Sequence, residues 1–85
     1  MEAGDLQGLT ERQRQVAALI VAGFSNDEVG ALLGISPRTA RAHSDAVRFK
    51  LGVLRRRHIS RAYLAANGGD LHRVLETVRA EQVQP

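Results

Sequence analysis

The sequence lacks cysteine altogether, which excludes disulfide bonds, cysteine-ligated zinc sites and thiol chemistry. It also lacks a long apolar run, because the longest strongly apolar stretch, residues 16–22, is far too short to span a membrane. Residues 1–8 contain no basic segment leading into an apolar core, so no signal peptide is predicted. We therefore expect a cytoplasmic protein that makes no membrane contact.

The patterns that usually carry catalysis or metal binding are missing too. The three histidines, His43, His58 and His72, are 15 and 14 positions apart, which is not a spacing of metal ligands. No Ser/His/Asp set, glycine-rich phosphate loop or supported pair of carboxylates stands out. We expect a protein that is not an enzyme and that needs neither a metal nor another cofactor.

What the sequence does contain is basic charge concentrated in one segment. The chain of 85 residues has a net charge of +3 and is 44% hydrophobic, which suits one small domain with a modest core. Residues 36–61 hold eight basic side chains and a single acid, a balance of +7, whereas residues 1–35 and 62–85 carry −3 and −1. Such a segment favours a polyanion such as nucleic acid as its partner, although a solvated charged face has the same composition.

Apolar residues recur at helical spacing, and no alternation typical of strands is present. Thr10, with Gln13 three residues later, matches a capping box, and Ser36 followed by Pro37 is the clearest helix start in the chain. The sequence therefore predicts an all-α fold with helices at residues 11–22, 26–33, 37–51, 55–66 and 70–82.

The second and third of these helices form a helix-turn-helix pattern. They are joined by the short connection Gly34-Ile35-Ser36, in which a glycine permits a tight turn. Two small residues, Gly30 and Ala40, would let the two helices cross closely. In such motifs the second helix enters the major groove of DNA and the first braces it.

The resemblance to a known family extends beyond this motif. From residue 9 to about residue 65 the chain resembles the LuxR-type (GerE-like) DNA-binding domain, through Leu9-Thr10, Arg12, Val16, Gly23, Ser25-Asn26, Glu28, Leu32-Leu33, Ile35-Ser36, Thr39, His43, Val47 and Lys50-Leu51-Gly52-Val53. The resemblance implies a four-helix domain over residues 9–66 that binds double-stranded DNA as a transcriptional regulator. Residues 1–8 would be a flexible lead-in, and residues 67–85 a linker with an additional C-terminal helix.

The candidate DNA-binding residues are Arg38, Thr39, Arg41, Ala42, His43, Asp45, Arg48, Lys50 and Arg56. Arg41 is the best candidate for reading a base, because arginine pairs with guanine through two hydrogen bonds. Arg38 and Lys50 suit phosphate contacts. The Thr39 hydroxyl would bond either a phosphate or its own helix end, and Asp45 would either repel phosphate or accept from cytosine. His43 is either a phosphate contact or a half-buried packing residue.

The resemblance also implies a homodimer that forms through the fourth helix. The stripe assigned to it is Ile59, Ala62, Tyr63 and Ala66, which is either core or dimer surface. Phe49 would pack against this helix or remain an exposed contact. The fifth helix would cap the core, extend the dimer or dock a protein partner.

Two other functions fit parts of the sequence. A sigma-factor-like promoter-binding region has a similar helix-turn-helix, but the helix after residue 53 and its apolar stripe argue against it. A protein-interaction module built on a degenerate domain is favoured by Gln13, Gln15, Asp27 and Asp45, which depart from the family pattern. The sequence also fits either a stand-alone regulator or the output domain of a longer one.

Overall fold

The computed structural model describes residues 8–67 and 71–82, and every regular element within them is helical. The elements are α1 (Glu11–Val21), α2 (Asn26–Leu33), α3 (Pro37–Leu51), the 3₁₀ turn η2 (Arg56–His58), α4 (Ile59–Asn67) and α5 (Leu71–Gln82). The predicted all-α fold with an extra C-terminal helix is confirmed. The predicted helix at 55–66 differs at its start, because its first turn is 3₁₀. Residue 70, where the last predicted helix begins, lies outside the described residues.

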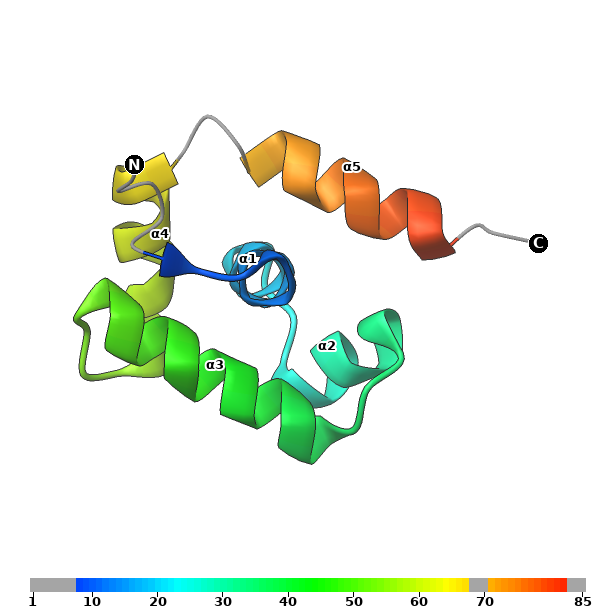
Figure 1. Cartoon of the computed structure of the whole chain (residues 1–85), viewed down its shortest axis with the longest axis horizontal. Helices are drawn as coiled ribbons and strands as arrows, with labels where there is room; N and C mark the ends of the chain where they lie inside the picture. The colour runs from blue at the N-terminus through cyan, green and yellow to red at the C-terminus, as the bar shows by residue number, and fades with distance from the viewer. Residues whose placement is uncertain (1–7, 68–70, 83–85) are drawn as a thin grey trace.

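Helix α1 is the centre around which the others are arranged. It packs against each of the other four α-helices, and Figure 1 shows it nearly end-on, with α3 and α5 on opposite sides. Its residues 15–20 are all buried. The core that forms around it draws on every α-helix and contains Val16, Val29, Val47, Ile59, Tyr63 and Val78.

Local capping signals fix where the first three helices begin. Thr10 and Gln13 form the expected capping box at α1, with both reciprocal hydrogen bonds 3.1 Å long. Ser25 and Glu28 form a second capping box at α2. At α3 the Ser36 hydroxyl oxygen accepts from the Thr39 amide at 3.0 Å, and Pro37 occupies the first turn. These side chains satisfy helix-end amides that would otherwise lack partners.

The turn between α2 and α3 depends on Gly30. A Cβ atom at this position would lie 2.7 Å from the Ile35 carbonyl oxygen and 3.3 Å from the Pro37 nitrogen. The sequence predicted that another helix crosses closely here, whereas the close neighbours of Gly30 are the backbone of the turn and of the first residue of α3. Gly34 ends α2 in the left-handed conformation, with φ of 71°. Together they bring the start of α3 directly against α2.

Candidate nucleic-acid interface

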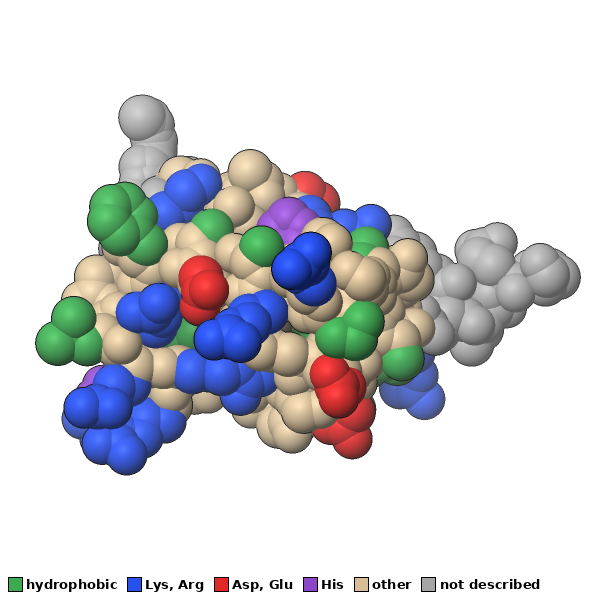
Figure 2. All heavy atoms as spheres, turned by 90° about the horizontal axis from the view of Figure 1, so that it is seen from below, with side chains coloured by type: hydrophobic (Ala, Val, Ile, Leu, Met, Phe, Trp, Pro, Cys, Tyr) green, Lys and Arg blue, Asp and Glu red, His purple; other side chains and the backbone are tan. Residues whose placement is uncertain are grey.

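The outward face of α3 carries exposed basic side chains. Ala40, Ser44 and Val47 point into the core, which leaves Arg38 and Arg41 exposed on the other side of the helix. Neither arginine forms a hydrogen bond or ion pair with another described residue. Figure 2 shows this side of the molecule, where several lysine and arginine side chains gather and acidic side chains lie among them and farther along the face. The face can therefore receive an anion.

Three other basic residues that were predicted to bind DNA form hydrogen bonds within the chain. Arg48 Nη1 donates to the Leu54 carbonyl at 3.0 Å, and Arg56 Nη2 donates to the Phe24 carbonyl at 2.9 Å. Lys50 Nζ donates to the Gly8 carbonyl at 3.0 Å and to Gln13 Oε1 at 2.9 Å. These three side chains connect loops and helices of the domain. Arg38 and Arg41 form no such hydrogen bonds with the other described residues. Sequence spacing did not reveal the difference, because the partners are remote in the chain.

The remaining residues predicted on this face have distinct positions. Ala42 is exposed, whereas His43 is half-buried. Asp45 lies 3.4 Å from Arg48 Nη2, one turn farther along α3. The Thr39 hydroxyl oxygen accepts from the Ser36 hydroxyl at 3.0 Å, which places Thr39 at its own helix end, one of the two roles left open for it.

The stripe assigned to the dimer is largely core in this structure. Ile59 and Tyr63 have no exposed surface, because α4 packs against α1 and α3. Buried in this way, neither side chain is accessible to a second copy, so the dimer assignment of these two residues is corrected to a core role. Ala62 is half-buried, and the Ala66 side chain lies outside the described residues.

Two large apolar side chains lie at the far end of α3. Phe49 is 84% exposed and Leu54 is 86% exposed. Of the two positions considered for Phe49, the exposed one is observed. Leu54 was not singled out from the sequence, since it follows the helix stop at Gly52 and belongs to no periodic stripe.

Within the described ranges, no group of three or more His, Asp or Glu side chains is placed to hold a metal ion. No described helix is long and apolar enough to cross a membrane.

The fold and this face define a helix-turn-helix protein with a basic outward helix. The family model for bacterial regulatory proteins of the luxR family matches residues 7–63. The chain therefore belongs to the LuxR family, which confirms the resemblance noted in the sequence. The family match includes α1 to α3 and most of α4, and it ends before α5.

Several curated proteins are similar to this chain. The transcriptional regulatory protein FixJ of Rhizobium meliloti is 41% identical over 64 residues, which are 75% of this chain and 31% of FixJ. The transcriptional regulatory protein UhpA of Salmonella typhimurium is 42% identical over 53 residues, 62% of this chain and 27% of UhpA. The transcriptional regulatory protein MctR of Rhizobium johnstonii is 47% identical over 45 residues, 53% of this chain and 21% of MctR. The chain thus spans less than a third of the length of these relatives. No solved structure matches it significantly.

Proposed function

We propose that this chain binds duplex DNA with sequence preference through α3, as the DNA-binding part of a transcriptional regulator. The observation that carries the proposal is the exposure of Arg38 and Arg41 on the outward face of a braced helix. An α-helix fits the major groove of B-DNA, where arginine recognises guanine by two hydrogen bonds. The names of the relatives, each a transcriptional regulatory protein, support the same function.

Arg38 and Arg41 make different contacts with DNA in this proposal. Arg41 lies one turn into α3 and reads a base edge, while Arg38 in the first turn contacts the phosphate backbone. Arg48, Lys50 and Arg56 position the interface through the bonds described above, and only their remaining N–H groups face DNA. Ala42 is small enough to let the backbone of α3 approach the bases.

Dimerisation is the second part of the proposal, and it uses the exposed side of α4. Ala62 and Ala65 lie beside Arg57, His58 and Arg61 around a shallow hollow. Two copies that met here would bring like charges together, which opposes association in free solution. A DNA polyanion that crosses both copies would screen this repulsion. We therefore expect a homodimer on DNA rather than a stable dimer without it.

The proposal is tested by measuring DNA binding of the full chain. Duplexes selected from a random pool, and scrambled versions of them, are titrated by fluorescence anisotropy at about 50 and about 200 mM salt. The double variant Arg38→Ala/Arg41→Ala should lose most of its preference for the selected duplex. The matched control is Arg73→Ala/Arg79→Ala on α5, which removes the same charge from the opposite side of α1 (Figure 1). Equal losses in both double variants would show only a general effect of charge and would contradict the proposed role of α3.

A further inference from the structure

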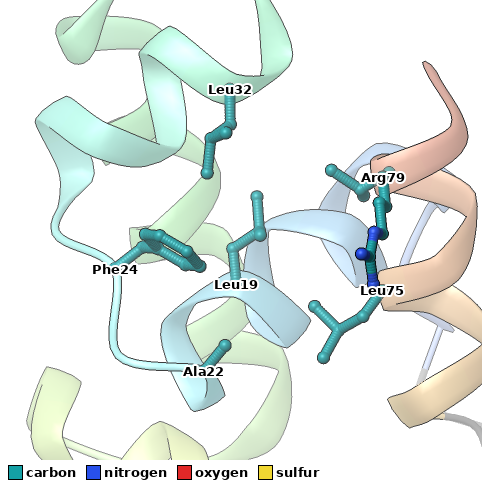
Figure 3. Close-up of a pocket in the computed structure, with 7 residues that line it drawn as sticks. Leu19, Ala22, Phe24, Leu32, Leu75 and Arg79 are labelled. Atoms are coloured by element: carbon teal, nitrogen blue, oxygen red, sulfur yellow. The ribbon is translucent and has the colours of Figure 1, made fainter. Parts of the chain in front are cut away.

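A hollow lies between α1, α2 and α5, away from the outward face of α3. It has a volume of about 400 Å³ and is lined by Leu19, Ala22, Phe24, Leu32, Leu75, Val78 and Arg79. Figure 3 shows Phe24 and Leu32 on one side of Leu19, with Leu75 and Arg79 facing them from α5. Pockets that bind small molecules commonly have volumes of about 300–1,000 Å³ and mostly apolar walls.

One wall of this hollow comes from a helix outside the family match. The family model ends at residue 63, whereas Leu75, Val78 and Arg79 belong to α5. Of the apolar lining residues, Leu19 and Val78 are buried, while Phe24, Leu32 and Leu75 are half-buried. The half-buried side chains leave apolar surface that a bound molecule would remove from water.

Arg79 is the only charged side chain among the described residues that line the hollow. Arg79 is exposed at its edge next to Leu75, and it has no hydrogen bond or ion pair with another described residue. No acidic residue of the described ranges lines the hollow. An occupant with an apolar body and one anionic group would therefore match both the walls and the edge, since the guanidinium pairs well with carboxylate.

We propose that the hollow between α1, α2 and α5 binds a small amphipathic molecule with one anionic group, held by apolar contacts inside and by Arg79 at the edge. A carboxylate or phosphate group would serve equally as the anion. The proposal does not depend on DNA binding, because the site and the outward face of α3 share no residue.

The test titrates isotope-labelled full chain, without DNA, with octanoate below its micelle-forming concentration. Amide NMR signals of the lining residues should shift in a saturable way. Octanol and octyltrimethylammonium have the same alkyl chain, with a neutral and a cationic head. We expect octanoate to bind up to about fivefold more tightly than octanol, as one exposed ion pair allows, and the cation to bind most weakly.

Two variants and one control separate the contribution of the charge from that of the cavity. Arg79→Gln should remove the preference for octanoate over octanol, whereas Arg73→Gln on the same helix should leave it unchanged. Ala22→Phe should block both ligands by filling the hollow, and it should fold because Ala22 is exposed. The headgroup comparison stands without Ala22→Phe if that variant is unstable.

Three results would overturn the proposal. Shifts centred on the exposed Phe49 and Leu54 would show adsorption to any apolar surface. Equal affinity for octanoate and octyltrimethylammonium would remove the role of Arg79. An absence of saturable shifts with all three ligands would show that the hollow stays empty or receives a protein segment.

Discussion

The ammonium group of Lys50, near the end of α3, lies 2.9 Å from Gln13 Oε1 on α1. The same oxygen accepts from the Thr10 amide in the capping box of α1. Lys50 also donates to the Gly8 carbonyl. One side chain therefore connects the C-terminal end of the proposed DNA-binding helix to the N-terminal end of the central helix, in addition to any contact it makes with DNA.

Lys50→Ala should lower the free energy of unfolding by about 1–2 kcal/mol, because hydrogen bonds to a charged donor are lost at a half-buried position. Urea unfolding of the full chain measures the change. Arg57→Ala is the control, since Arg57 is exposed and its removal should change stability by less than about 0.5 kcal/mol. An unchanged urea midpoint for Lys50→Ala would show that Lys50 is free in solution and available to phosphate.

Gln13→Glu should act in the opposite direction. Glutamate can still close the capping box, and its charge would strengthen the bond to Lys50, so we expect a gain of about 0.5–1 kcal/mol near pH 7. Pairing would place the folded-state pKa of the new carboxyl below its unfolded value of about 4.3. The gain should therefore be present above that pH and disappear as the pH falls through the folded-state pKa. Unfolding curves at pH 7 and pH 3, with and without high salt, would show whether the gain is electrostatic.

The starts of α1 to α3 could be predicted because they depend on neighbouring residues. Thr10, Ser25 and Ser36 cap helices within three positions of themselves, so a local pattern is sufficient. The helix-turn-helix was predictable for the same reason, through its turn residues and small residues.

The hydrogen-bond partners of the basic side chains could not be predicted from local sequence patterns. Lys50 bonds Gln13 and Arg56 bonds Phe24, and each pair is brought together only by the packing of distant segments. Spacing placed Ile59 and Tyr63 on one stripe, but it did not reveal that α1 and α3 cover that stripe. Chain periodicity identifies an apolar face, whereas the tertiary fold decides whether that face is core or surface.

Gly30→Ala distinguishes helix propensity from the close approach at the turn. Propensity alone predicts a gain of about 1 kcal/mol for alanine inside a helix. The structure predicts a loss of about 1–3 kcal/mol, because the new Cβ would lie 2.7 Å from the Ile35 carbonyl oxygen. Ala31→Gly, at the next and exposed position of α2, should show the propensity effect alone. A higher thermal midpoint for Gly30→Ala would contradict the close approach.

Tyr63 and Phe49 should respond oppositely to truncation. Tyr63→Ala should destabilise the chain by about 3–5 kcal/mol, because it removes one of the largest fully buried side chains. Phe49→Ala should change stability by less than about 0.5 kcal/mol, since this ring is 84% exposed. Thermal unfolding of both variants without DNA provides the comparison. If Tyr63→Ala kept its stability and lost only dimerisation, Tyr63 would be a dimer contact and its core assignment would be wrong.

Arg41, Arg38 and Asp45 on the outward face of α3 should contribute differently to DNA binding. Arg41→Ala should cost about 1–3 kcal/mol on a selected duplex and little on a scrambled one, because a base contact is lost. Arg38→Ala should weaken binding to both duplexes alike and lower the salt slope by about one unit, as expected for a phosphate contact. Asp45 is near Arg48, so its carboxylate is already engaged. Asp45→Ala should tighten binding to both duplexes, because it removes a carboxylate that repels DNA phosphate. If the variant instead lost its preference at one base pair, Asp45 would be a contact to cytosine.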